Sequence, residues 1–395
     1  MIDVILKKGK EKAVLHRHPW VFSGAIEKVK GKPENGEIVK LIDAKGAFMA
    51  YGFYNDQSRV ALRLLEWDEN VVIDEQWFRN KVKEAVASRD NVLIAGVTNT
   101  CRLIFSESDY LPGLIVDKYA DHLAVQVLTS GIEKMMPAII DELNTLLKPL
   151  SIFDKSDASS RGHEGLETQN IVLAGSHPPA RVEVIENGIV YNINIAEGQK
   201  SGFYCDQRDN RKIVAAYAKG KNVLDCFSYT GGFTLNSLQN GAASVTAVDS
   251  SVLAIDTLKE NVLLNKFDAG KVSTIASDVN KQLRKFREEG AFFDIVVLDP
   301  PKYAPSRSAL DKASRAYKDL NRLGMLLLNK GGLLATYSCS GAMNMETFKQ
   351  VIAWAALDAG KQVQFIHQFC QPEDHPLRSS FPEGEYLKGL LCRVF

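Results

Sequence analysis

The sequence predicts an α/β protein whose second half forms a mostly parallel, seven-stranded sheet of the Rossmann-like type. Three observations predict this fold. From residue 206 onward, helical and extended patterns alternate, which is typical of a parallel sheet covered by helices. Several of the apolar runs end in an acid. The last two runs, 362–369 and 386–394, are joined by a segment without a helical pattern. The final strand is therefore expected to run antiparallel.

Short strands and turns are predicted for a first domain at residues 1–70. The runs 36–42 and 47–53 are rich in β-forming residues, and the turn Asp43-Ala44-Lys45-Gly46 separates them, which indicates a hairpin. Trp20 and Phe22 alternate with other residues near the start. We interpret both as core residues of this domain rather than as base-stacking groups.

A compact α+β domain is predicted for residues 71–185. The polar, aperiodic stretch 157–169 is expected to be a loop. Residues 182–195 alternate across Asn187-Gly188, which predicts a type I′ hairpin leading into the next domain. The expected helices are 74–89 and 135–147, and the expected strands are 102–105, 114–119, 122–128 and 151–155.

The third domain, 186–395, carries the alternating pattern. Asp206 is expected to cap the N-terminus of a helix that runs to residue 218. A further helix follows the glycines near residue 232. The other expected helices are 251–265, 279–288, 310–329 and 345–358, and the expected strands are 222–227, 244–248, 272–276, 293–298, 332–337, 362–369 and 386–394.

A glycine turn after the first strand of this domain predicts a nucleoside cofactor. Asp225 lies in the strand, the turn Ser228–Phe233 contains Gly231 and Gly232, and Asp249 closes the next strand. In Rossmann-like sheets the second acid receives ribose hydroxyls. The turn is not G-x-G-x-x-G, and Asp225 would repel a phosphate. S-adenosylmethionine, with a ribose, an adenine and a cationic sulfonium but no phosphate, therefore fits best.

Other residues are expected to complete this cofactor site. Asp278 follows the strand 272–276 and is placed near the adenine amino group. The segment 202–208 precedes a helix start, where backbone amides can meet the carboxylate of the methionine part. The expected cofactor-binding residues are Phe203, Gln207, Arg208, Asp225, Phe227, Gly231, Gly232, Asp249, Asp278 and Asp299.

An acid and a thiol follow two further strands of the sheet. Asp299-Pro300-Pro301-Lys302 ends one apolar run, and Ser338-Cys339-Ser340-Gly341 ends the next. Proline cannot continue a central strand, so Asp299 must lie where strand becomes loop. Ligands bind at this carboxyl edge of open α/β sheets. Cys339 and Asp299 are therefore predicted to be catalytic residues acting on a flat, polar substrate.

Five motifs spread over the whole chain carry a resemblance to a known family. They are residues 17–22 (RHPWVF), 107–114 (ESDYLPGL), 202–208 (GFYCDQR), 299–302 (DPPK) and 338–340 (SCS). With these motifs the chain resembles the RlmI family of 23S ribosomal RNA large-subunit methyltransferases, which make 5-methylcytosine. The resemblance implies a PUA-like, RNA-binding β-barrel at 1–70, a class I methyltransferase domain at 186–395, and a catalytic role for Cys339.

Methylation at carbon 5 of cytosine calls for covalent catalysis. A thiolate that adds to carbon 6 makes carbon 5 nucleophilic, and Cys339 is the expected nucleophile. Asp299 is expected to hydrogen-bond ring N3 or the exocyclic amine, and Lys302 or the sulfonium is expected to favour the thiolate. A second cysteine, found in another class of RNA 5-methylcytosine enzymes, is absent beside Pro300. The base that releases the adduct stays unassigned.

Two alternatives stay open. Asp-Pro-Pro also resembles the motif of amino-group methyltransferases, for which the target would be an exocyclic guanine amine and Cys339 would be unnecessary. The other alternative is that the protein is a non-catalytic RNA-binding assembly factor. The intact residues Asp225, Gly231, Gly232, Asp249 and Asp299 argue against it.

Charge and composition limit which partners and which cellular location the sequence predicts. The net charge is zero, yet residues 1–32 carry eight Lys/Arg against three acids, and residues 302–330 carry seven against two. Such patches neutralise phosphates, so Lys302, Arg307 and Arg315 are expected to contact RNA. The charged start and the absence of long apolar runs predict no signal peptide and no membrane span. Six cysteines without framework spacing predict a cytoplasmic protein. The histidines form no metal pattern, and the oligomeric state is open, with a homodimer among the alternatives.

Overall fold

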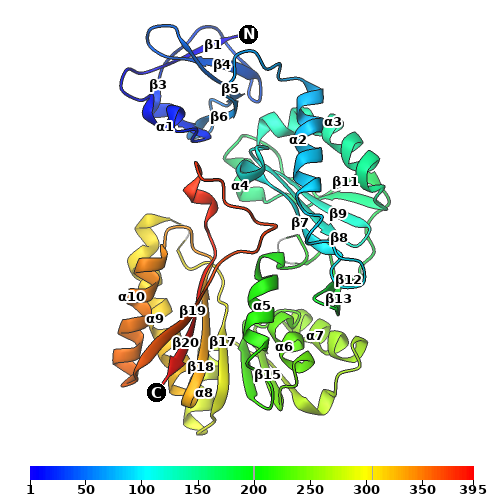
Figure 1. Ribbon diagram of the computed structural model, residues 1–395, viewed down its shortest axis with the longest axis vertical. Helices are drawn as coiled ribbons and strands as arrows, with labels where there is room; N and C mark the ends of the chain where they lie inside the picture. The colour runs from blue at the N-terminus through cyan, green and yellow to red at the C-terminus, as the bar shows by residue number, and fades with distance from the viewer. Residues whose placement is uncertain (199–200, 305) are drawn as a thin grey trace. The chain divides into compact units, whose positions relative to one another are not determined.

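The computed structural model describes residues 1–198, 201–304 and 306–395, and these form two compact units (Figure 1). The first unit comprises Met1–Val184, Asn194–Cys205 and Glu373–Gly384. The second comprises Ile185–Ile193, Asp206–Pro372 and Glu385–Phe395. The division into three domains at residues 70 and 185 stays a prediction.

A six-stranded sheet in the order β2-β6-β5-β4-β1-β3 opens the first unit. The expected hairpin forms between β4 and β5, where the Asp43 carboxylate accepts the backbone N–H groups of Lys45 and Ala47, each at 2.8 Å. The strands are β1 Asp3–Leu6, β2 Trp20–Phe22, β3 Ile26–Val29, β4 Ile38–Ile42, β5 Phe48–Tyr54 and β6 Val60–Glu66, with the short helix α1 Lys12–Leu15 and the 3-10 turn η1 Ser23–Ala25.

The side chains of β2 correct one expectation. Val21 is the buried residue of this strand, at 4% exposure, and it packs with Val4, Leu41 and other core residues. Trp20 is only partly buried, and Phe22 is 52% exposed. Because successive side chains of a strand point to opposite faces, burial of Val21 turns Phe22 outward. The interpretation of Phe22 as core was wrong.

A five-stranded sheet, β11-β10-β9-β8-β7, and two helices form the rest of the first unit. Trp77, Phe78 and Val82 of α2 pack with sheet residues such as Leu103 and Val125. The elements are α2 Glu75–Ala87, β7 Thr100–Phe105, β8 Leu114–Tyr119, β9 His122–Val127, α3 Ser130–Leu147, β10 Ser151–Asp154, α4 Ala158–Gly162 and β11 Val172–Gly175.

Two predictions for this region need correction. Helix α3 begins at Ser130 rather than at residue 135, because Thr129 caps it by accepting the N–H of Ile132. The stretch 157–169 is not all loop. Asp157 accepts the N–H of Ser160 at 2.7 Å and starts α4. The periodicity missed this helix because it spans little more than one turn.

The hairpin of β12 Val182–Glu186 and β13 Ile189–Ile193 confirms its predicted turn. Asn187 and Gly188 have φ values of 54° and 76°, and a type I′ turn requires positive φ at both central positions.

The second unit contains the predicted seven-stranded sheet, in the order β16-β15-β14-β17-β18-β20-β19. The first five strands of this order are parallel, and β20 runs antiparallel to both β18 and β19, as expected. The strands are β14 Asn222–Cys226, β15 Ser244–Asp249, β16 Val272–Ala276, β17 Phe293–Leu298, β18 Leu328–Ser338, β19 Val363–Phe369 and β20 Lys388–Val394.

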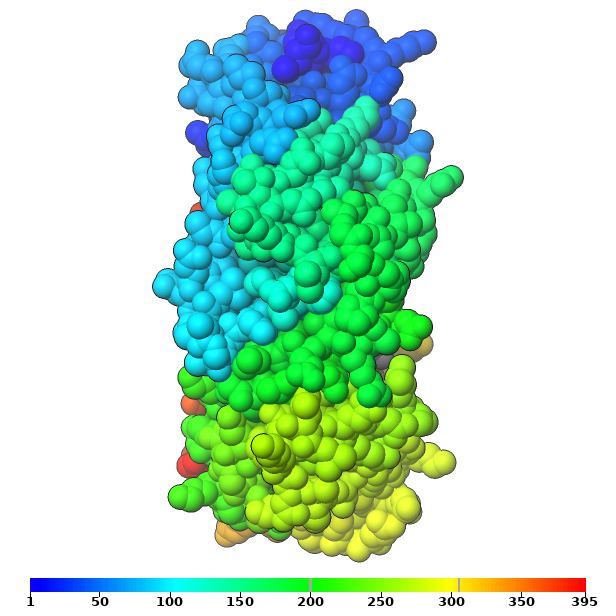
Figure 2. Space-filling view, turned by 90° about the vertical axis from the view of Figure 1, so that its right-hand side faces the viewer, coloured from blue at the N-terminus to red at the C-terminus, as the bar shows by residue number. Residues whose placement is uncertain are grey.

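Helices cover both faces of this sheet (Figure 1). Leu224 and Leu298 pack with residues of α8, α9 and α10, whereas Val223 and Val297, on the opposite face, pack with residues of α5 and α6. Helix α7 lies against β15 through Leu258 and Val262 and is part of the face shown in yellow-green in Figure 2. The helices are α5 Arg208–Ala215, α6 Gly232–Gln239, α7 Val252–Leu264, α8 Val279–Glu288, α9 Leu310–Leu326 and α10 Met345–Ala359.

Asp206 does not cap α5, contrary to the prediction. The residues Cys205–Gln207 form a 3-10 turn, and Gln207 occupies the cap position, where its side chain accepts no capping hydrogen bond from the helix backbone. The Asp206 carboxylate instead accepts the hydroxyl of Tyr386 at 2.7 Å. The helix also ends at Ala215, earlier than residue 218.

Candidate active site

The turn after β14 has a strained backbone. Phe227 and Tyr229 have φ values of 62° and 47°, and Gly231 follows at 94°. Positive φ is uncommon for bulky residues and is often found at ligand sites. Asp249 holds this turn in place, because its carboxylate accepts the N–H of Tyr229 at 2.9 Å and that of Ser251 at 2.8 Å. The end of β15 is thus joined to the turn that follows β14.

Packing explains why the turn needs two glycines. A Cβ atom on Gly231 would lie 2.5 Å from Leu235 Cδ1 and 2.8 Å from Leu258 Cγ. A Cβ atom on Gly232 would lie 2.5 Å from Arg211 Nε. Both glycines therefore let the start of α6 approach its neighbours closely, and Gly232 leaves room for a guanidinium.

Asp225 is a buried carboxylate with one free oxygen. Its Oδ2 accepts the backbone N–H and the hydroxyl of Thr234, at 2.9 and 2.7 Å, and so fixes the first turn of α6. Its Oδ1 is buried and has no hydrogen-bond partner among the described residues. Burial raises the pKa of Asp225 to about 7, and the charge of Asp299 acts in the same direction. Such an oxygen can accept a hydrogen bond from a cationic ligand.

Further buried polar atoms around this turn have no partner within the described part of the chain. They are Ser228 Oγ, Thr230 Oγ1 and Tyr337 Oη. Burial raises the pKa of Tyr337, and the charges of Asp299 and Asp225 raise it further. Buried polar groups are rarely left unsatisfied in proteins. The set therefore fits a bound polar group such as the amino-acid end of S-adenosylmethionine.

A buried ion pair lies beside Gly232. Arg211 Nη1 is 2.6 Å from Glu186 Oε1, and both side chains are almost fully buried. Burial opposes the charge of Arg211, but Glu186 and Tyr191 outweigh it, and the pKa of Arg211 is raised. The sequence analysis missed Arg211, Glu186 and Tyr337. The sequence held one indication for Arg211, since it lies one helical turn after Gln207, a residue predicted to bind the cofactor.

The loop carrying Cys339 is anchored by its two serines. Ser338 and Ser340 are fully buried. Ser338 donates to the hydroxyl of Tyr317 at 3.0 Å, and Ser340 Oγ lies 3.2 Å from the same hydroxyl. Cys339 lies between them and is only partly buried. The serines therefore hold the loop while the thiol stays accessible.

The structure brings this thiol next to the Asp-Pro-Pro turn, as predicted from neighbouring strands. Cys339 Sγ is 3.9 Å from the carbonyl oxygen of Pro300. The N–H of Ala304, beyond the prolines, donates to Ser340 Oγ at 3.0 Å. Two strand ends, those of β17 and β18, are thus linked around Cys339.

A buried lysine from β20 reaches the same loop. Lys388 is 2% exposed, and its Nζ donates to the Ser340 carbonyl at 3.1 Å. Burial lowers the pKa of Lys388, whereas the charge of Glu385 and, to a smaller extent, that of Cys339 act to raise it. The sequence predicted Lys302 or the sulfonium as the positive charge near the thiol and gave no sign of Lys388, which lies far from Cys339 along the chain. Lys302 itself is exposed.

Several predicted residues have local partners. Asp278 accepts the N–H of Lys281 at 2.8 Å and caps α8. Gln207 Oε1 accepts from Asn210 at 2.6 Å, while its Nε2 has no partner among the residues described. Arg208 Nε donates to Asp209 at 3.0 Å. The predicted RNA contacts Lys302, Arg307 and Arg315 are all exposed.

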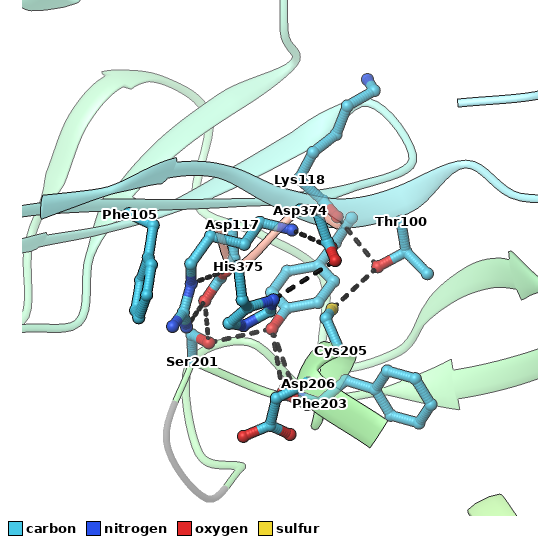
Figure 3. A network of polar contacts seen from close by, with 12 residues as sticks. Thr100, Phe105, Asp117, Lys118, Ser201, Phe203, Cys205, Asp206, Asp374 and His375 are labelled. Atoms are coloured by element: carbon cyan, nitrogen blue, oxygen red, sulfur yellow. Dashed lines mark hydrogen bonds and ion pairs between the residues drawn. The ribbon is translucent and has the colours of Figure 1, made fainter. Parts of the chain in front are cut away.

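Phe203 belongs to the first unit, where Ser201 and Phe203 make hydrogen bonds to β8 (Figure 3). The Tyr119 hydroxyl lies 2.9 Å from Ser201 Oγ and accepts the N–H of Phe203 at 3.2 Å. Ser201 also donates to Asp117, which Arg102 contacts at 2.8 Å. This network fixes Ser201 and Phe203 within the first unit.

Comparison with known proteins defines the class. Residues 166–379 match the family described as S-adenosylmethionine-dependent methyltransferase, and residues 4–67 match the family described as PUA-like domain. The fold and the glycine turn thus belong to a methyltransferase that uses S-adenosylmethionine, preceded by a PUA-like domain. Both the cofactor and the two domain types were predicted, and both are confirmed.

The particular family follows from full-length relatives. The ribosomal RNA large subunit methyltransferase I of Aliivibrio fischeri (strain MJ11) is 44% identical over 393 residues, covering 100% of this chain and 99% of its own. The protein of that name from Photobacterium profundum is 45% identical, covering 99% of each chain. The chain belongs to the ribosomal RNA large subunit methyltransferase I family, which confirms the resemblance.

Two solved structures share the fold at 21% identity, and each alignment covers 100% of both chains. One is a putative SAM-dependent methyltransferase from Streptococcus mutans, with a TM-score of 0.85. The other is a putative methyltransferase complexed with SAH, with a TM-score of 0.87. Within the described residues, no helix is long and apolar enough to cross a membrane, and no group of three or more His, Cys, Asp or Glu residues is arranged to hold a metal ion.

Proposed function

We propose that this enzyme methylates carbon 5 of a cytosine in 23S ribosomal RNA through a covalent adduct on Cys339. One observation carries the proposal. A partly exposed thiol lies beside the Asp-Pro-Pro turn, with Sγ 3.9 Å from the Pro300 carbonyl. The ribosomal RNA substrate rests on the names of relatives that are 42–45% identical over the full chain. Such a substrate also favours a cytoplasmic location.

S-adenosylmethionine supplies an electrophilic methyl group when bound. In this proposal Asp249 receives the ribose hydroxyls and Asp278 the adenine amino group. The free Oδ1 of Asp225 receives the ammonium of the methionine part. The other proposed contacts are those predicted from the sequence: Phe203, Gln207, Arg208, Phe227, Gly231, Gly232 and Asp299.

The chain's own residues account for activation of the base. The Cys339 thiolate forms a bond to carbon 6 of cytosine, and the electron pair of the 5,6 double bond moves toward carbon 5. Asp299 hydrogen-bonds N3 or the exocyclic amine. Carbon 5 then takes the methyl group, its proton leaves to a base, and the carbon–sulfur bond breaks to restore the thiolate.

Lys388 fits the role of stabilising that thiolate. Its ammonium is buried and hydrogen-bonds the carbonyl next to Cys339. A cation in a site shielded from water favours a nearby thiolate strongly, because little solvent screens the interaction. We therefore assign this role to Lys388 ahead of the exposed Lys302.

RNA would reach this site along a basic surface. Lys302 and Arg307 are exposed between the Asp-Pro-Pro turn and α9, and Arg315 is exposed on α9 itself. We propose that all three contact phosphates. In the same region, Lys318 is paired with Asp358 at 2.7 Å and Arg322 with Asp319 at 2.8 Å. These two are less available to RNA.

A trapping experiment tests the adduct. RNA containing 5-fluorocytosine should capture the wild-type enzyme, because fluorine does not leave carbon 5 as the proton does. The complex should survive denaturing electrophoresis, and Cys339→Ala should abolish it. Cys370→Ala is the matched control, since Cys370 is an exposed free cysteine and its loss should change nothing. Methylation by Cys339→Ala at the wild-type rate would instead support transfer to an exocyclic guanine amine.

A further inference from the structure

A buried tyrosine hydroxyl contacts both residues that flank Cys339. Tyr317 comes from α9, and its side chain is fully buried. Its Oη accepts the hydroxyl of Ser338 at 3.0 Å and lies 3.2 Å from Ser340 Oγ. A single group on a long helix therefore holds the loop on each side of the thiol.

The same hydroxyl also contacts the loop that follows the Asp-Pro-Pro turn. Burial raises the pKa of Tyr317, and hydrogen bonds with Ser338, Ser340 and the backbone of Tyr303 act against this rise. A tyrosine hydroxyl has one proton to donate and two lone pairs that can accept. These three partners therefore use its full hydrogen-bonding capacity, and they come from the loops after two neighbouring strands, β17 and β18.

The chain between Tyr303 and Asp299 is stiff. It contains two prolines, and each proline fixes its own φ at roughly −65°. A contact at Tyr303 therefore limits where Asp299 can lie. A second link runs through Ser340, whose Oγ accepts the N–H of Ala304 at 3.0 Å. Movement of either loop would thus break hydrogen bonds that involve the other.

Apolar packing holds the ring of Tyr317 without help from its hydroxyl. The ring centroid lies 4.9 Å from that of Tyr303 and 5.8 Å from that of Phe348, in a core cluster that includes Leu298 and Leu320. Phenylalanine would fill this place without a polar atom to satisfy, and a buried hydroxyl is costly unless it is hydrogen-bonded. What the tyrosine adds is its contacts to the two loops.

We propose that Tyr317 is a positioning residue for methyl transfer, because its hydroxyl sets the spacing between the Asp-Pro-Pro turn and the Cys339 thiol. The thiol has to reach carbon 6 of a base that Asp299 contacts. A misplacement of about 1 Å in such an arrangement can slow a reaction by about 100-fold. The inference rests on the proposed function, since it takes Cys339 as the attacking group.

Single-turnover methylation by full-length Tyr317→Phe tests this role. With saturating RNA and cofactor the rate should fall by about 10- to 100-fold, while the Kd values for RNA and S-adenosylmethionine stay within about twofold of wild type. The trapped complex with 5-fluorocytosine RNA should form more slowly by the same factor. Alkylation of Cys339 by iodoacetamide, in a Cys370→Ala background, should keep its pH dependence, because ionisation of the thiol is assigned to Lys388.

Ser340→Ala removes the other end of one of these contacts and gives a second, independent variant. It should also slow the single-turnover rate. Once Tyr317 has lost its hydroxyl, much of the link between the loops is already gone. The double variant should therefore be within about threefold of the slower single variant, whereas independent effects would multiply.

Thr336→Val is the matched control. Thr336 is a fully buried residue of β18, two positions before Ser338, and its hydroxyl has no hydrogen-bond partner within the described part of the chain. Loss of this hydroxyl should leave the single-turnover rate within about twofold of wild type. Thermal unfolding of every variant, followed by circular dichroism, confirms that the rates are measured on folded protein.

Three results would overturn the role of Tyr317. They are a wild-type rate for Tyr317→Phe, effects that multiply in the double variant, and an equal loss of rate for Thr336→Val, which would show a general sensitivity of this core. An alkylation profile displaced to higher pH would also contradict positioning, because the hydroxyl would then act on ionisation of the thiol.

Failure of the proposed function gives a different pattern. In that case Cys339→Ala methylates at the wild-type rate, and the wild-type enzyme forms no trapped complex with 5-fluorocytosine RNA. If the wild-type enzyme forms the complex and Tyr317→Phe forms it equally fast, the function stands and only the assignment of Tyr317 is wrong.

Discussion

The buried ammonium of Lys388 donates to the main-chain carbonyl of Ser340 at 3.1 Å, and so places a positive charge one residue from the Cys339 thiol. The two residues come from β20 and from the end of β18, which pair antiparallel. The reversed final strand of the sheet therefore brings a cation to the site at which we propose covalent catalysis.

Replacement of this lysine should make the thiol less reactive. Lys388→Met keeps most of the buried volume and removes the charge, so alkylation of Cys339 by iodoacetamide should need a higher pH, by about one unit or more. The measurement is the pH dependence of alkylation in a Cys370→Ala background. Lys302→Met is the matched control and should alter RNA binding instead. An unchanged alkylation profile for Lys388→Met would exclude the lysine from this role.

Cofactor binding should depend on the ionisation of Asp225. Its pKa is raised to about 7 by burial, so the free enzyme holds this carboxyl partly neutral at neutral pH. A cationic ligand favours the carboxylate. S-adenosylmethionine should therefore bind more tightly as pH rises, by about fivefold between pH 6 and 7, beyond any change seen with Asp225→Asn. Calorimetric titrations of both proteins at several pH values would measure this, and parallel curves would contradict it.

The same pKa shift affects stability with a definite sign. A carboxyl whose pKa is raised from 3.8 to about 7 on folding lowers the stability of the folded protein as pH rises through that window. Asp225→Asn lacks this titration. The free energy of unfolding of the variant should therefore improve relative to wild type between pH 4 and 7 and stay constant above it, as measured by denaturant unfolding.

Asp249 should contribute to cofactor affinity through the ribose. Asp249→Ala should weaken S-adenosylmethionine binding by about 1.5–3 kcal/mol, but it also removes the acceptor for the N–H groups of Tyr229 and Ser251. Asp249→Asn retains one acceptor oxygen and separates the two effects. The loss of affinity should disappear for an analogue without ribose hydroxyls. An equal loss for both ligands would show that Asp249 only shapes the turn.

Asp299 should act in the chemical step. Asp299→Asn should preserve the fold and cofactor binding while slowing methylation by about 10²- to 10⁴-fold, the usual scale for lost acid–base assistance. Single-turnover rates with saturating RNA and cofactor would measure this. A variant that methylates at the wild-type rate would remove Asp299 from the mechanism.

Sequence patterns suggested site residues that follow strand ends. Asp299 and Cys339 were predicted because prolines and serines stop two apolar runs, and adjacent parallel strands place such ends together. Asp249 was predicted for a similar reason, and the roles of all three stay predictions. The patterns also gave the seven-stranded sheet, since periodicity and connection length decide strand direction locally.

Residues inside elements escaped this reasoning. Tyr337 and Lys388 lie within strands, where apolar neighbours make them look like core or surface. Their roles depend on which other strands lie beside them. Phe22 was misplaced because a strand of three residues offers too little alternation to choose its inner face. The prediction that Asp206 caps a helix was wrong for two reasons. A 3-10 turn lies between Asp206 and the helix, and the hydroxyl of Tyr386, 180 positions away, donates a hydrogen bond to its carboxylate.

The ion pair between Glu186 and Arg211 affects how the chain can be divided into stable fragments. Glu186 lies in Ile185–Ile193, a short piece of the second unit that precedes a return of the chain to the first unit. A fragment beginning after Glu186 would leave the buried guanidinium of Arg211 without its carboxylate partner. The loss should lower the free energy of unfolding by about 3–5 kcal/mol. The path of the backbone thus means that no single cut yields either unit intact. Proteases that open one connecting segment should release no independently stable half.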